Sequence, residues 1–280
     1  MYHNAYVSAS TYLQNRKGPL LTDDLLRQAA AQAGLQPAAI VLRRLDASQP
    51  DLAIDPDAGF YPASMIKTPL AAAVLALVHD GELDLERRFE VTGANMTAND
   101  KPSPLVPGYE SPLSELLDLM ITRSDNVATN MLYDVAGRER ATGIVQDRFG
   151  LSKTAFRRKL SGSLPLIHDP QWDGVHMNAH PPSDAARLFE LIARSQIPFA
   201  WMLRQVLARQ EWNNKLSGGL QRADEFAHKT GDTDEVTHDG GILETSRGAS
   251  YVLVVYTGLE STDEHSARFA PFMRALRGAL

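Results

Sequence analysis

Three short motifs, met in a fixed order, constrain the fold of this chain more than any other feature. They are Ser64-Met65-Ile66-Lys67, Ser124-Asp125-Asn126 and Lys229-Thr230-Gly231. A serine three residues ahead of a lysine on a helix places the hydroxyl and the amine on one face. A lysine that is uncharged there can take the hydroxyl proton and turn the serine into a nucleophile. Each motif is weak alone, but together they predict one active site assembled from distant segments.

The hydropathy pattern around the motifs predicts an α+β architecture. Alternating apolar stretches predict strands over residues 39–45, 52–54, 226–230, 236–243 and 249–257. Helical spacing predicts helices starting near residue 22 and over residues 64–80, 113–122, 126–136, 185–193, 199–207 and 261–276. The order favours an antiparallel sheet that is built from both chain ends and packs against a helical middle.

This order also predicts a domain organisation. We expect an N-terminal arm over residues 1–20 and a single catalytic domain over residues 21–280. Within the domain, an α/β lobe would comprise about residues 21–62 and 213–280, and a helical lobe about residues 63–212. Residues 162–182 form a long polar loop, and loops of that length inside a domain are usually functional.

Composition excludes several classes of function. The net charge of −6 and the absence of a dense Lys/Arg run argue against nucleic-acid binding. We expect the scattered basic groups, such as Arg157-Arg158-Lys159, to be solvated. The lack of cysteine excludes disulfides, thiolate metal sites and a cysteine nucleophile. His176 and His180 have a spacing that can bind zinc on a helix, but prolines follow at once, so we expect no metal site.

The N-terminal residues predict the location of the protein. They contain neither a basic region nor an apolar core, so they do not form a signal peptide. The longest apolar run, residues 69–78, is too short to span a membrane. We therefore expect a soluble, cytoplasmic monomer. A native signal replaced by Met1 would instead imply a periplasmic or secreted protein.

The motifs and their surroundings resemble the class A β-lactamase-like family of serine hydrolases, which includes penicillin-binding proteins. Residues 119–132, 181–186, 216–220, 228–231 and 252–256 are similar to segments of that family, so the resemblance covers about residues 25–276. It implies a β-lactamase/transpeptidase-like fold, an acyl-enzyme mechanism without a cofactor, and a small-molecule β-lactam, peptide or ester as substrate.

The resemblance also implies roles for the motif residues. Ser64 would be the acylated nucleophile, Lys67 its base or proton relay, and Ser124 the proton shuttle to the leaving group. Backbone N–H groups of Ser64 and Asp232 would form the oxyanion hole. The substrate would be bound by Asn126, Lys229, Thr230, Gly231 and Thr233.

Two departures from the family pattern concern turnover and substrate. Efficient class A enzymes carry a loop glutamate that activates the deacylating water. Here no glutamate occurs between Glu139 and Glu190, and Lys159 or Leu160 stands near the expected position. Asp169 and Asp173 are the nearest acids; each could activate water, face solvent or cap a turn.

The second departure is Asp232, where the family usually has a small neutral residue. Two like charges about 4 Å apart repel by roughly 4 kcal/mol at an effective dielectric constant of about 20. This disfavours a substrate carboxylate unless Asp232 points away or pairs with Lys229. We therefore expect a serine hydrolase that cleaves a β-lactam or a related amide or ester. The alternatives are a slow-turnover penicillin-binding or sensor protein, a DD-peptidase or esterase, and an inert scaffold.

Overall fold

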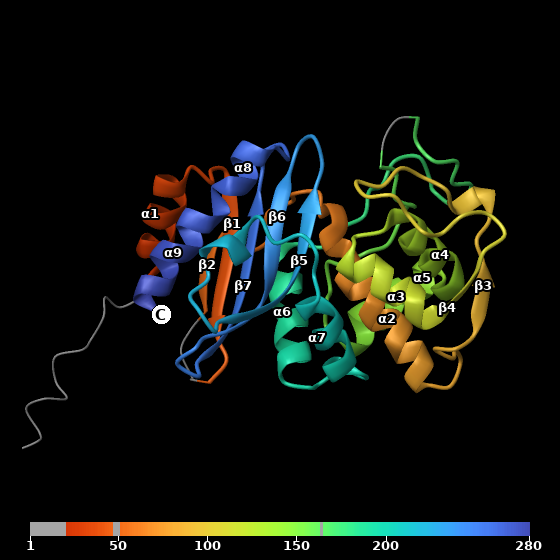
Figure 1. The fold of residues 1–280 in the computed structure, drawn as a ribbon, viewed down its shortest axis with the longest axis horizontal. Helices are drawn as coiled ribbons and strands as arrows, with labels where there is room; N and C mark the ends of the chain where they lie inside the picture. Colours follow the sequence, from red (N-terminus) through yellow and green to blue (C-terminus); the bar gives the residue numbers. More distant parts are fainter. Residues whose placement is uncertain (1–20, 47–50, 163–164) are drawn as a thin grey trace, which may run out of the picture.

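The computed structural model describes residues 21–46, 51–162 and 165–280, so the predicted arm lies outside the described residues. At its centre is an antiparallel sheet of five strands in the order β2-β1-β7-β6-β5 (Figure 1). The strands are β1 (Ala38–Arg44), β2 (Leu52–Ile54), β5 (Glu225–Asp232), β6 (Thr237–Glu244) and β7 (Ser250–Thr257). Because β1 pairs with β7, with Ile40 opposite Val255, the two ends of the described chain meet in one sheet, as predicted.

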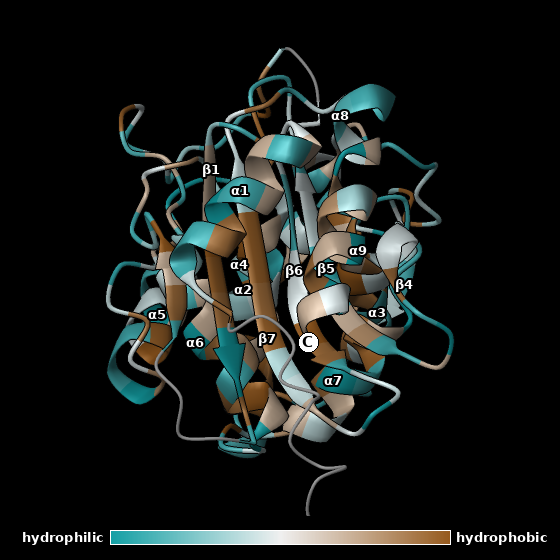
Figure 2. Ribbon diagram, turned by 90° about the vertical axis from the view of Figure 1, so that its left-hand side faces the viewer, coloured by the Kyte–Doolittle hydropathy of each residue, from teal (hydrophilic) through white to brown (hydrophobic). Residues whose placement is uncertain are grey.

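Each face of the sheet is covered by its own apolar core. Successive strand residues point to opposite faces. Ile40, Leu253 and Val255 therefore pack with Phe272 on one side, under α1 (Asp23–Ala33) and α9 (Phe269–Ala279). Val41 and Val254 belong to the other core, which the sheet shares with the helical middle of the chain. Figure 2 shows β7 as hydrophobic over much of its length, as this double coverage requires.

The helical middle surrounds α2 (Lys67–His79), in which every residue from Lys67 to Leu77 is buried. Against it lie α3 (Leu113–Thr122), α4 (Asn126–Ala136), α5 (Arg138–Gly143) and a π-helical turn, Ile144–Arg148. The helices α6 (Pro182–Ala193) and α7 (Ala200–Ala208) pack between this group and the sheet (Figure 1). The predicted helices at residues 113–122 and 126–136 are confirmed.

Some elements differ from the sequence-based expectations. The helix predicted from residue 64 begins with a 3₁₀ turn, Ala63–Ile66, so Ser64 precedes α2. The last predicted helix is two helices, α8 (Asp263–Ala267) and α9. The Arg268 N–H bonds to the carbonyl of His265, three residues back, which interrupts the α-helical ladder. The short strands β3 (Arg88–Glu90) and β4 (Glu110–Pro112) were not predicted, because each pairs over only three residues.

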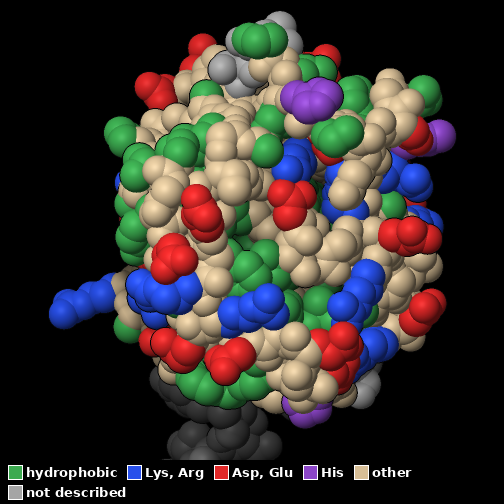
Figure 3. Space-filling model, turned by 90° about the vertical axis from the view of Figure 1, so that its right-hand side faces the viewer, with side chains coloured by type: hydrophobic (Ala, Val, Ile, Leu, Met, Phe, Trp, Pro, Cys, Tyr) green, Lys and Arg blue, Asp and Glu red, His purple; other side chains and the backbone are tan. Residues whose placement is uncertain are grey.

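The surface of the helical side carries charges of both signs. Figure 3 shows basic and acidic side chains interspersed over this face, with no extended patch of one sign. Within the described ranges, no helix has the length and apolar character needed to cross a bilayer.

Candidate active site

The three motifs meet at the edge of the sheet. Ser64 lies in the 3₁₀ turn before α2, Ser124 lies between α3 and α4, and Lys229 lies on the edge strand β5. The strand packs closely on the turn. A Cβ at Gly231 would lie 3.0 Å from the Pro62 carbonyl oxygen and 3.2 Å from the Met65 nitrogen. Glycine at this position therefore allows β5 to approach the turn that carries Ser64.

Lys67 is fully buried and held by the second motif. Its Nζ donates to the Ser124 carbonyl oxygen at 2.6 Å, to Ser124 Oγ at 3.1 Å and to Asn126 Oδ1 at 2.8 Å. Burial, and then the charge of Lys229, hold the pKa of Lys67 well below its ordinary value. The amine can therefore lose its proton and act as a base.

Lys229 approaches the same hydroxyl from the strand. Its Nζ donates to Ser124 Oγ at 3.0 Å and to the Thr230 carbonyl oxygen at 3.0 Å. Burial lowers the pKa of Lys229 to about 7, although Asp232 acts to raise it. Ser124 Oγ thus bridges two buried amines, and protons can move among the three groups.

The backbone of Ser124 has an unusual conformation. Its φ of 60° lies in the left-handed region, which costs a non-glycine residue of order 1–3 kcal/mol. Lys67 fixes the Ser124 carbonyl, and the Asp125 side chain caps α4 by accepting from the Ala128 N–H. The surroundings therefore impose the turn that aims Ser124 at the two lysines.

The predicted site residues border two adjoining cavities. One, of about 470 Å³, is lined by Ser64, Ser124, Asn126, Asp232 and Thr233. The other, of about 450 Å³, shares Ser64, Ser124, Asp232 and Thr233 and adds Thr230 and Lys215. Lys67, Gly231 and Lys229 are buried behind these walls. In the described part of the chain, Ser64 Oγ makes no hydrogen bond, and the Lys67 amine donates to Ser124 and Asn126.

Asp232 is paired with a lysine that sequence reasoning missed. Its Oδ1 accepts from Lys215 Nζ at 2.6 Å, from Thr237 Oγ1 at 2.8 Å and from Ser261 Oγ at 2.7 Å. Burial acts to raise the pKa of the carboxyl group, but Lys215 and these hydrogen bonds hold it below its ordinary value. The partner is thus Lys215 rather than Lys229, which leaves the Lys229 amine to Ser124.

The two acids proposed for deacylation lie away from Ser64. Asp169 forms a bidentate ion pair with Arg138, with both N–O distances at 2.7 Å, and its side chain is 3% exposed. Asp173 pairs with His176 at the surface, at 2.6 Å. Among the described residues, neither acid borders the cavities that Ser64 lines.

Of the two residues near the expected position of the loop glutamate, Lys159 pairs with Asp134 at 2.7 Å, and the other is Leu160. It lines the 470 Å³ cavity with Ser64. Asn130 holds its backbone: Oδ1 accepts from the Leu160 N–H at 2.8 Å, and Nδ2 donates to its carbonyl at 3.0 Å. The acids that do border this cavity are Asp100, Asp232 and Asp234. Asp100 sits in a proline-rich loop without a recognisable pattern, so the sequence offered no signal for it.

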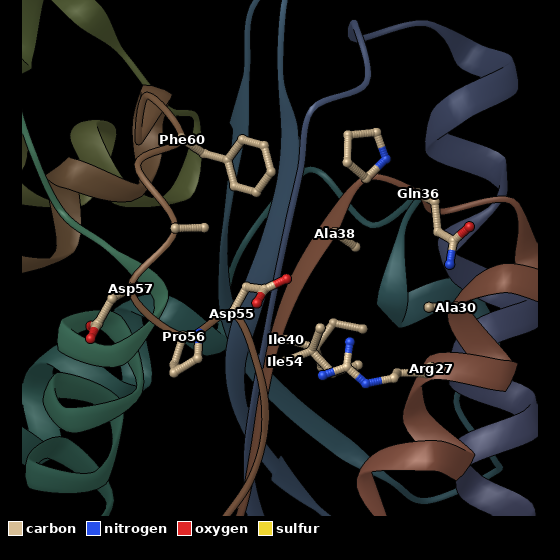
Figure 4. Close-up of a pocket in the computed structure, with 12 residues that line it drawn as sticks. Arg27, Ala30, Gln36, Ala38, Ile40, Ile54, Asp55, Pro56, Asp57 and Phe60 are labelled. Carbon is tan, nitrogen blue, oxygen red and sulfur yellow. The ribbon is translucent and has the colours of Figure 1, made fainter.

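A larger cavity, of about 950 Å³, lies apart from the motifs (Figure 4). Its walls come from α1, β1 and the segment that follows β2, including Arg27, Ile40 and Phe60. None of the motif residues lines it. Within the part of the chain that the structure describes, no group of three or more His, Asp or Glu residues could hold a metal ion.

Comparisons with known proteins concern the family and the fold of this chain. Residues 21–271 match the family described as the beta-lactamase enzyme family. The extended-spectrum beta-lactamase PER-1 of Pseudomonas aeruginosa is 26% identical over 222 residues, which are 73% of this chain and 70% of the relative. The beta-lactamase regulatory protein BlaB of Streptomyces cacaoi is 25% identical over 83% of this chain and 87% of its own. The structure of a point mutant of PBP-A, an acyl-enzyme complex with penicillin G, superposes with a TM-score of 0.76 at 26% identity, covering 90% of this chain and 94% of that one.

Proposed function

This chain belongs to the beta-lactamase enzyme family, and from that premise we propose that it is an active-site serine hydrolase acylated on Ser64. Its substrate is a small-molecule β-lactam or a related amide or ester. Residues 21–280 act as one catalytic domain and as a monomer. No cofactor is needed, because side chains and water supply every proton transfer.

The proposed reaction has two bond changes. Ser64 Oγ attacks the carbonyl carbon while its proton passes to the neutral Lys67 amine. The backbone N–H groups of Ser64 and Asp232 stabilise the oxyanion. When the carbonyl bond to the leaving nitrogen or oxygen breaks, Ser124 Oγ protonates the leaving group and recovers a proton from Lys67. The product is an acyl-enzyme ester on Ser64.

The observation that carries this proposal is the hydrogen-bonded group formed by Lys67 Nζ, Ser124 Oγ and Lys229 Nζ. Its two contacts are 3.1 and 3.0 Å long, and they lie behind a cavity lined by Ser64. The lowered pKa of each lysine supports a role in proton transfer.

A second candidate is slow turnover, as in a penicillin-binding or sensor protein, a DD-peptidase or an esterase. Leu160 on the cavity wall and the pairing of Asp169 with Arg138 favour it, because neither can activate the deacylating water. Two relatives are compatible with it: BlaB is called a regulatory protein, and a mutant of PBP-A was captured as an acyl-enzyme with penicillin G. The ion pair of Asp232 with Lys215 reduces the repulsion that the Asp232 carboxylate would exert on the carboxylate of a β-lactam.

Pre-steady-state kinetics with a chromogenic β-lactam and an activated ester would test the proposal. We expect a burst of one product per protein molecule followed by a slower steady state, since acylation precedes a poorly catalysed deacylation. Ser64→Ala should show no burst. The proposal fails if neither compound gives a burst or turnover, or if Ser64→Ala reacts as fast as the wild type.

A further inference from the structure

Arg158 is buried although the sequence predicted a solvated residue. It is 7% exposed, Nε donates to the Lys159 carbonyl at 3.1 Å, and the guanidinium lies 4.7 Å from the centre of the Trp172 ring. Its Nη1 reaches only Met177 Sδ, at 3.9 Å. Across residues 21–46, 51–162 and 165–280, which contain every Asp and Glu of the chain, no carboxylate forms an ion pair with it.

The other buried arginines of the described chain have acidic partners. Arg138 pairs with Asp169, and Arg277 pairs with Asp224, each at 2.7 Å. Lys67 and Lys229 reduce the cost of a buried positive charge, because the lowered pKa lets each amine lose its proton. An arginine cannot lose its proton in this way, and an unpaired buried charge is costly. Arg158 therefore keeps a positive charge for which the protein itself supplies no counter-ion.

Arg158 lines a cavity that continues from the proposed active site. This compartment has a volume of about 640 Å³ and walls of mixed polarity, whose apolar residues include Phe60, Leu166 and Met177. It shares several wall residues with the cavity that Ser64 lines: Tyr61, Ser161, Leu166, Thr233 and Asp234. A ligand attached to Ser64 can therefore extend past Tyr61 towards Arg158.

The other titratable groups of this compartment are neutral, paired or exposed, so Arg158 is the group that can bind an anion there. Burial lowers the pKa of His180 to about 3, so its ring is neutral. Asp57 and Lys153 pair with each other at 2.6 Å. Asp234 and Glu235 are exposed, so water screens their charges. The buried and desolvated charge of this compartment is thus positive.

We propose that this compartment is the subsite for the acyl part of the substrate, and that Arg158 binds a carboxylate at the end of an apolar stem. The inference rests on the proposed function. A leaving group must reach Ser124, which lines both cavities that Ser64 borders but not this compartment. The acyl part therefore occupies the other side. A guanidinium can bind a carboxylate through two parallel hydrogen bonds.

Two esters with matched leaving groups and acyl chains of six carbons would test the subsite. They are p-nitrophenyl hexanoate and mono-p-nitrophenyl adipate, which differ by the terminal carboxylate. We expect the wild type to be acylated about 10- to 100-fold more efficiently by the adipate, the range for a charged hydrogen bond. Arg158→Gln should lose this preference with little change towards the hexanoate, and Arg158→Lys should retain part of it. Arg157→Gln, which alters the exposed neighbour, should behave as the wild type.

The outcomes separate the two proposals. Acylation of Ser64 by both esters at similar rates in the wild type would overturn the anionic subsite and leave the hydrolase intact. The same conclusion would follow if Arg158→Gln kept the preference for the adipate. Acylation by neither ester, together with no burst or turnover of the chromogenic β-lactam, would overturn the proposed function itself, and the subsite with it. The wild-type comparison decides even if Arg158→Gln does not fold.

Discussion

At the scale of residues, the proposed chemistry depends on how burial acts on two lysines. Lys67 and Lys229 both contact Ser124 Oγ, and each has a lowered pKa because charged amines are poorly solvated in the interior. The sequence could pair Ser64 with Lys67 through helical spacing. It could not reveal that Ser124 bridges the lysines, since that contact depends on how β5 packs against the helices.

The pKa of Lys229 makes stability depend on pH. Between about pH 7 and its ordinary pKa of 10.5, the unfolded chain holds a proton that the native amine has lost. Stability therefore rises with pH in this window, by at most about 1.4 kcal/mol per pH unit. We expect the unfolding free energy of the wild type minus that of Lys229→Met to increase from pH 7 to pH 9 in urea titrations. A difference that does not change with pH would mean that native Lys229 keeps its proton.

Leu160 limits deacylation in the proposed mechanism. Its backbone is fixed by Asn130 and the residue borders the cavity of Ser64, so a carboxylate placed there could activate water. We expect Leu160→Glu to increase the steady-state rate at least about 10-fold, within the usual contribution of a general base. The burst rate should change little. Leu160→Gln is the matched control, and equal rates for both variants would contradict this role of the position.

At the scale of elements, the segment before the long loop is tied down by three polar side chains. Asn178 Oδ1 accepts from the N–H groups of Arg157 and Arg158, Asp169 accepts from the Lys159 N–H at 2.7 Å, and Asn130 holds Leu160. The composition of residues 162–182 predicted a functional loop but not its contacts. Strands and helices follow short periodic patterns that a sequence reveals. These hydrogen bonds instead join residues 10 to 30 positions apart without any period, so the sequence does not predict them.

Asp169 therefore has a structural role that a mutation can separate from catalysis. Asp169→Asn leaves Arg138 buried without a full counter-charge, and breaking such a pair typically costs about 3–5 kcal/mol. We expect a lower midpoint in chemical unfolding for this variant. Asp173→Asn, at the exposed pair with His176, should be close to neutral for stability and turnover. Full stability together with lost deacylation in Asp169→Asn would instead assign the carboxylate to catalysis.

At the scale of the whole molecule, only one of the two apolar cores adjoins the proposed active site. The core under α1 and α9 lies on the far face of the sheet, and the core shared with the helices lies beside Lys67. The chain order of strands and helices predicted a sheet built from both chain ends and packed against the helical middle, but not the second core on its far face. The break at Arg268 and the 3₁₀ turn at Ser64 could not be predicted, since local hydrogen bonding decides them.

This arrangement separates stability from activity. Phe272 is fully buried in the far core, so Phe272→Ala should destabilise the fold by about 3–5 kcal/mol. Below its unfolding transition, the variant should acylate at the wild-type rate per folded molecule, because the residues around Ser64 are unchanged. Burst kinetics at low temperature would check this. A large loss of rate in the folded variant would show that the far core positions the site.

The most direct test of the proposed mechanism is the intact mass of the protein after incubation with penicillin G, followed by peptide mapping. We predict a single adduct of the full mass of the drug, located on Ser64 and missing from Ser64→Ala. It should be long-lived in the wild type and short-lived in Leu160→Glu. Unmodified protein without hydrolysed drug, or an adduct on another residue, would contradict acylation of Ser64.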